Sequence, residues 1–117
     1  MDLESVINSF LEYCSYEKKY SSHTIVAYEK ALVQLLEYFR DEYDDNPDIR
    51  NINTEILRPF LGWLDDKNIS RNTMRLRVSA VKSFFSYCYK KQLLIKNIAA
   101  NILIPKKNKI LPSYLSV

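Results

Sequence analysis

Apolar side chains recur at intervals of three and four residues along most of this chain, and that spacing constrains the fold more than any other feature of the sequence. This spacing predicts a first helix from residue 2 to about residue 18. Its apolar face carries Leu3, Val6, Ile7, Phe10, Leu11 and Cys14. A single Gly and four Pro leave little of the turn chemistry that hairpin-rich β proteins require. The chain is therefore predicted to be all-α.

A second helix is predicted to begin with Ser21 or Ser22 as its N-cap and to end near Arg40. Its apolar face carries Ile25, Tyr28, Leu32, Leu35, Leu36 and Phe39. Because these residues repeat with helical spacing, they form one face of the predicted helix. Leu35 is expected to be nearly fully buried.

After a polar loop at residues 44–53, Thr54 is expected to restart a helix that covers about residues 54–67. Pro59 within that range predicts a kink, or a later start at Leu57 or Arg58, because an internal proline removes a backbone hydrogen bond. Ser70 then caps a fourth helix at about residues 71–91. The remaining residues are predicted to form a mostly extended tail, punctuated by Pro105 and Pro112.

The fourth predicted helix, "RNTMRLRVSAVKSFFSYCYKK", contains six basic side chains and no acidic one, with apolar residues such as Leu76 between them. At 100° per residue its polar face collects Arg71, Asn72, Arg75, Ser79, Lys82, Ser83, Ser86, Tyr89 and Lys90. Met74, Val81, Phe84, Phe85 and Cys88 fall opposite, and Phe84 is expected to be buried. Arg77 falls on the apolar side, so it should pair with an acid of the first half or extend toward a partner.

Charge is divided along the chain. Through Asp66 there are six Lys and Arg against fourteen Asp and Glu, whereas from Lys67 onward there are eleven Lys and Arg and no acid. Ordinary protein surfaces mix both signs, so a long acid-free tract favours a polyanionic partner such as DNA. Basic amphipathic helices also bind membranes and acidic proteins, and charge alone leaves these alternatives open.

The segment "YSSHT" places hydroxyls and backbone N–H groups at the start of the second helix, where phosphate can bind. Ordinary helix capping also explains these residues. The sequence shows no secretory signal and no long apolar span, so we expect a cytoplasmic protein without a membrane partner. Cys14 and Cys88 are expected to be reduced core thiols, and with the lone His23 they do not form a metal site. No cofactor is expected.

Three segments resemble one family in order and spacing, over about residues 3–115. "YSSHTIVAYEKAL" is similar to the S-x-x-T-x-x-x-Y start of helix B in the core-binding, SAM-like domain of tyrosine recombinases of the Xer and phage-integrase type. "RLRVSAVKSFFSYCYKK" resembles that domain's last long helix. "IKNIAANILIPKKNKILPSYLS" resembles the stretch that follows, usually N-P-A-x-x-I-x-x-P-K and then L-P-x-x-L. Ile98 stands where the family usually has Pro, and Val78 where it often has Leu.

The resemblance implies a four-helix SAM-like bundle of two crossed helical hairpins with an extended C-terminal tail. Residues 1–100 would form the core-binding domain, and residues 101–117 would be a linker toward a C-terminal catalytic domain that is absent here. It also implies double-stranded DNA as partner, with the second and fourth helices at the major groove, and other recombinase protomers in a synaptic assembly. The predicted DNA contacts are Ser21, Ser22, Thr24, Tyr28, Ser70, Arg71, Asn72, Arg75, Arg77, Ser79, Lys82, Lys106 and Lys107.

We expect this chain to bind DNA without cutting it. Family members place their catalytic Arg, His and Tyr in the second domain, after a stretch that here runs from Leu111 to Leu115. His23 has no Arg three residues on, so no H-x-x-R motif is present. Lys18 and Arg50 lie in the acid-rich half and are expected to stay away from DNA. The alternative function is a helical protein-interaction module whose basic face meets an acidic partner; a helix-turn-helix transcription factor ranks third.

Overall fold

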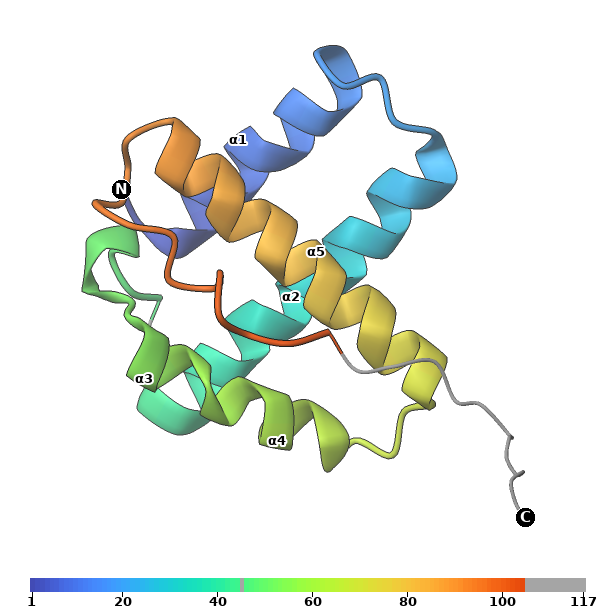
Figure 1. Ribbon diagram of the computed structural model, residues 1–117, viewed down its shortest axis with the longest axis vertical. Coiled ribbons are helices and arrows are strands. Elements are labelled where there is room, and N and C mark those ends of the chain that lie inside the picture. Colours follow the sequence, from blue (N-terminus) through green and yellow to red (C-terminus); the bar gives the residue numbers. More distant parts are fainter. Residues whose placement is uncertain (45, 105–117) are drawn as a thin grey trace.

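The computed structural model describes residues 1–44 and 46–104, and within these residues the regular structure is helical. The helices are α1 (Leu3–Tyr16), α2 (Ser22–Tyr43), α3 (Thr54–Leu57), α4 (Pro59–Asp65) and α5 (Arg71–Lys90), with a short 3₁₀ turn, η1, at Ile49–Asn51 (Figure 1). The predicted all-α class is confirmed.

Two helices begin at the caps that the sequence predicts, α2 at Ser21 and α5 at Ser70, and α1 begins at a cap that was not predicted, Asp2. The side chains of Asp2, Ser21 and Ser70 each accept a hydrogen bond from the backbone N–H three residues on, at 3.2, 3.2 and 3.1 Å. Each cap satisfies one of the backbone donors that a helix start leaves without an intrahelical partner. At the other end, α2 continues to Tyr43, a little beyond the predicted end near Arg40.

The predicted helix at residues 54–67 is divided into α3 and α4. The break falls at Arg58, directly before Pro59, and Pro59 occupies the first turn of α4, where its missing N–H costs nothing. The residue that caps α3 is Asn53, whose side chain accepts from the Ile56 N–H at 2.9 Å. Thr54 instead donates its hydroxyl to the carbonyl of Ile98 at 2.8 Å, which ties α3 to the chain after α5.

Two helical hairpins cross at the middle of the molecule. The antiparallel α1 and α2 form one, and α3 and α4 with α5 form the other; α5 crosses α2 and also contacts α1 and α4 (Figure 1). The predicted crossed arrangement is confirmed. At the crossing, Leu35 and Phe84 are both fully buried, as predicted. Phe84 meets the rings of Phe10 and Phe85 edge-on, with centroids 5.5 and 5.0 Å apart.

The chain after α5 differs from the predicted tail. Residues 91–101 form turns rather than an extended segment, and Leu94, Ile98 and Ala99 are buried in the core. Ile102, which the prediction placed in the linker, is also buried. These apolar side chains cover the space between α5 and α3, and residues 105–117 of the predicted linker lie outside the described residues.

Candidate nucleic-acid interface

The first halves of α2 and α5 lie on the same side of the helix crossing (Figure 1). Between them is a hollow of about 520 Å³, which we name the α2–α5 hollow. Its lining comes from α2 through Ser22, His23, Val26, Ala27 and Lys30, and from α5 through Thr73, Leu76 and Arg77. The lining holds two cations, hydroxyls from both helices and no acidic side chain.

Helical spacing explains why these residues share one surface. Ser22, Val26 and Lys30 follow one another at four-residue intervals along α2, and Thr73 with Arg77 does the same on α5. Each set therefore forms a stripe along its helix. The crossing of the two helices brings the stripes to opposite walls of the hollow.

The two helices that line the hollow start with the same capping pattern. Ser21 and Thr24 at α2 have their hydroxyl oxygens 3.1 Å apart, and Ser70 and Thr73 at α5 have theirs 3.0 Å apart. A helix start carries four backbone N–H groups outside the intrahelical ladder, and each cap takes only one of them. Both starts can therefore donate to phosphate oxygens, which the predicted contacts at Ser21, Ser22, Thr24 and Ser70 require.

Arg77 contacts a neutral side chain and not an acid of the first half, which was one of the two alternatives predicted for it; the other, extension toward a partner, stays a prediction. Its Nε donates to Oε1 of Gln34 on α2 at 2.6 Å, and its side chain is half-buried. This bond crosses from α5 to α2 next to the hollow. A guanidinium has five N–H donors, so the Gln34 contact leaves Arg77 able to donate to a ligand in the hollow as well.

Lys82 is directed to the chain after α5. Its ammonium donates to the carbonyl oxygens of Ala100, at 3.3 Å, and of Ile102. Those carbonyls lie in irregular backbone without a helical partner, which explains why a cation settles there. The ammonium has three donors, so the predicted phosphate contact of Lys82 stays a prediction.

A second hollow, of about 410 Å³, lies between the second half of α5 and the α1–α2 hairpin, and we name it the lysine hollow. It brings together Lys82, Lys90, Ser79 and Lys18, with several tyrosines. Lys18 lies in the acid-rich half of the sequence and was for that reason expected to stay away from DNA. The turn after α1 folds back beside α5 and places Lys18 on the same hollow as Lys82 and Lys90, and whether Lys18 contacts DNA stays a prediction.

Tyr28, a predicted DNA contact, belongs to an aromatic cluster on the wall of the lysine hollow. Its ring stacks on Phe10 and meets Tyr20 edge-on, with both centroid distances 5.9 Å. Of the other predicted contacts, Arg71 and Asn72 are exposed in the first turn of α5, and Arg75 is half-buried. Lys106 and Lys107 lie outside the described residues.

Several residues that line the α2–α5 hollow or the lysine hollow were not predicted from the sequence, namely Lys18, His23, Val26, Lys30 and Leu76. For Leu76 a signal was present. It lies four residues after Asn72 and three before Ser79, both on the predicted polar face, and the structure leaves its side chain 58% exposed. For the α2 residues no local signal exists, because only the crossing geometry brings them beside α5.

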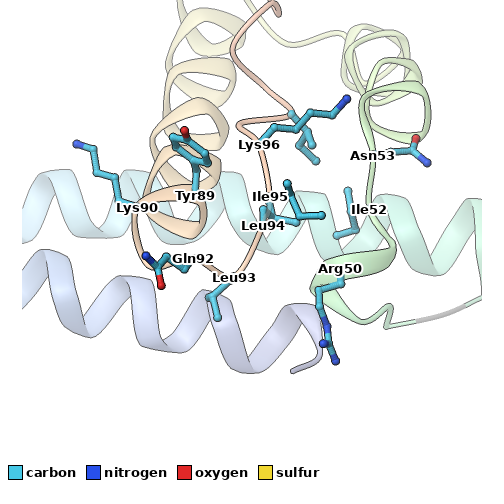
Figure 2. A pocket seen from close by; sticks show the side chains of 11 residues that line it. Arg50, Ile52, Asn53, Tyr89, Lys90, Gln92, Leu93, Leu94, Ile95 and Lys96 are labelled. Carbon is cyan, nitrogen blue, oxygen red and sulfur yellow. The ribbon is translucent and has the colours of Figure 1, made fainter.

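A third hollow, of about 750 Å³, lies between the turn after α5 and the segment around η1 (Figure 2). We name it the tail hollow. Ile52, Leu94 and Ile98 form an apolar floor, while Arg50, Lys90 and Lys96 stand at its rim. Arg50 also lies 3.5 Å from the carboxylate of Asp48, which reduces its effective charge.

The two thiols are buried, as predicted. Burial raises the pKa of the Cys88 thiol to about 12 and raises the pKa of the Cys14 thiol as well. Among the described residues, no three His, Cys, Asp or Glu side chains are grouped as metal ligands. No helix in that part of the chain has the length and apolar character to span a membrane.

Comparison with known proteins points to one family. The phage integrase N-terminal SAM-like domain matches residues 7–92. The chain is 33% identical over 117 residues to the tyrosine recombinase XerC of Rickettsia canadensis, an alignment that covers 97% of the chain and 38% of that protein. It is 31% identical over 108 residues to XerC of Natranaerobius thermophilus, covering 92% of the chain and 36% of that protein. No solved structure gives a significant match.

Proposed function

The chain belongs to the phage integrase family through its N-terminal SAM-like domain, and from this we propose that it is the DNA-binding part of a site-specific tyrosine recombinase. It spans about 38% of the length of its relatives from Rickettsia. Strand transfer would belong to the part of the recombinase outside this domain, as the family resemblance implies. Cooperation with further protomers on the same DNA is part of the proposal.

The observation that carries the proposal is the α2–α5 hollow. Lys30 and Arg77 supply positive charge, Ser22 and Thr73 supply hydroxyls, and no acid is present in its lining. Cations and hydroxyls are the groups that bind phosphate oxygens and fix the position of a protein on a duplex. We propose that both helix starts enter one major groove, whose width accommodates an α-helix.

The test is a titration of a fluorescent duplex with this chain at several salt concentrations. With about five phosphate contacts, the logarithm of the association constant should fall against the logarithm of salt with a slope near −4 to −5. Binding would therefore be weak at physiological salt. A flat dependence, or no binding at low salt, would reject the proposal.

A second candidate is a protein-interaction module for an acidic partner, and the tail hollow favours it. Its apolar floor is rimmed by Arg50, Lys90 and Lys96, and its lining contains no acid. An amphipathic peptide of Leu and Glu should then bind the chain, and Lys96→Glu should weaken that binding. Binding of such a peptide combined with indifference to duplex DNA would favour this candidate over the first.

A further inference from the structure

Two large apolar side chains stand exposed in the α2–α5 hollow. Val26 is 48% exposed and Leu76 is 58% exposed, although both lie in well-formed helices with buried apolar neighbours. They come from opposite walls of the same hollow. An exposed Val or Leu alone needs no explanation, but two that line the same hollow within a polar, cationic surface form a local apolar patch.

The groups around this patch restrict what can occupy it. Ser22 and Thr73 stand at the helix starts, and Lys30 and Arg77 stand at the inner end, so an apolar pair is surrounded by donors for phosphate. Since no acid lines the hollow, its charge fits a polyanion better than a basic or neutral peptide. A ligand that fits this hollow should therefore present an apolar group surrounded by polar groups, with phosphates on either side.

The edge of a DNA base pair in the major groove offers one apolar group, the C5-methyl of thymine. Phosphates and sugars flank it at the distance of the groove walls. Resting on the proposed DNA-binding function, we propose that Val26 and Leu76 contact thymine methyl groups and so determine part of the target sequence. The charged and hydroxyl side chains around them would position the helices without reading sequence.

The test separates this inference from DNA binding itself. Duplexes that the chain enriches from a random pool are resynthesised with uracil in place of thymine, which removes only the methyl groups. For each methyl that is contacted, the uracil duplex should bind about fourfold more weakly, as expected for one buried carbon group. Leu76→Ala and Val26→Ala should each bring the thymine-to-uracil ratio toward one. Both side chains are exposed, so folding should be preserved.

Val33→Ala is the matched control, because Val33 is also on α2 and 44% exposed but lies outside the hollow. It should retain the full thymine-to-uracil ratio. Salt-sensitive binding with equal affinity for both duplexes, or enriched sites without thymine, would overturn this inference and leave the proposed function standing. Absence of any salt-sensitive duplex binding would overturn both.

Discussion

Phe84 shows how a single residue of α5 serves the core while its neighbours serve the surface. Its side chain is fully buried and touches rings from α1 and from its own helix. Phe84→Ala should lower the free energy of unfolding by about 3–5 kcal/mol, because it removes buried area and leaves a cavity. Chemical denaturation measures this loss.

Tyr89→Ala is the control for that substitution, since Tyr89 lies on the same helix but is 48% exposed. Its loss should stay below about 1 kcal/mol. Similar losses of unfolding free energy for the two variants would mean that α5 does not turn Phe84 toward the core and Tyr89 toward the solvent.

Asp2 couples the stability of α1 to pH. Hydrogen bonds from the Ser5 hydroxyl, then from the Asn46 amide and the Ser5 N–H, lower its pKa from 3.8 to about 2. Because the folded pKa lies below the unfolded one, the stabilisation is present above about pH 4 and is lost as pH falls toward 2. The urea midpoint should therefore drop in that window.

Asp2→Asn tests that coupling, because Asn can still cap the helix but does not titrate there. The drop in its urea midpoint between about pH 4 and pH 2 should be smaller than in the unmodified chain. Other carboxylates, including Asp48, whose pKa is also lowered, contribute alike to both proteins. Identical pH profiles would exclude a role for Asp2.

At the scale of elements, Lys82 links α5 to the segment after it. Lys82→Met keeps the apolar stem and removes the ammonium that binds the carbonyls of Ala100 and Ile102. Hydrogen bonds to a charged group contribute about 1.5–3 kcal/mol, so exchange of the Ile102 amide should quicken by about tenfold or more. Amides within α5 should keep their protection, and so should Ile102 in the control variant Lys96→Met. Unchanged exchange at Ile102 in Lys82→Met would contradict the proposed link.

The elements that could be predicted from the sequence are those with local signals. The caps Ser21 and Ser70 act within one helical turn, so residue type and spacing suffice to place them. The packing of Leu94 and Ile102 could not be predicted, because these residues have no helical period and are buried only by distant elements. The polar face of α5 could be predicted because it follows from helical spacing within one segment. The α2 residues opposite it could not, because only the crossing of the two helices brings them there.

In the sequence, acidic residues lie in the first part and basic residues dominate the second, but the fold of the whole molecule does not keep these two parts separate. The acid-rich first part supplies half of the candidate interface, because residues 18–28 contain no acid and the fold places them beside the acid-free α5. The face that we assign to DNA is thus basic on both helices. Arg50 belongs to η1 and lines the tail hollow (Figure 2), and it is absent from the lining of the α2–α5 hollow.

The central claim is that DNA binds across the first halves of α2 and α5, and the salt dependence of three variants tests it most directly. Lys30→Ala and Arg71→Ala should each weaken duplex binding and reduce the magnitude of the salt slope by about one. Arg50→Ala should change neither the affinity nor the slope. If Arg50→Ala weakens binding as much as Lys30→Ala does, then the duplex lies on another face of the molecule.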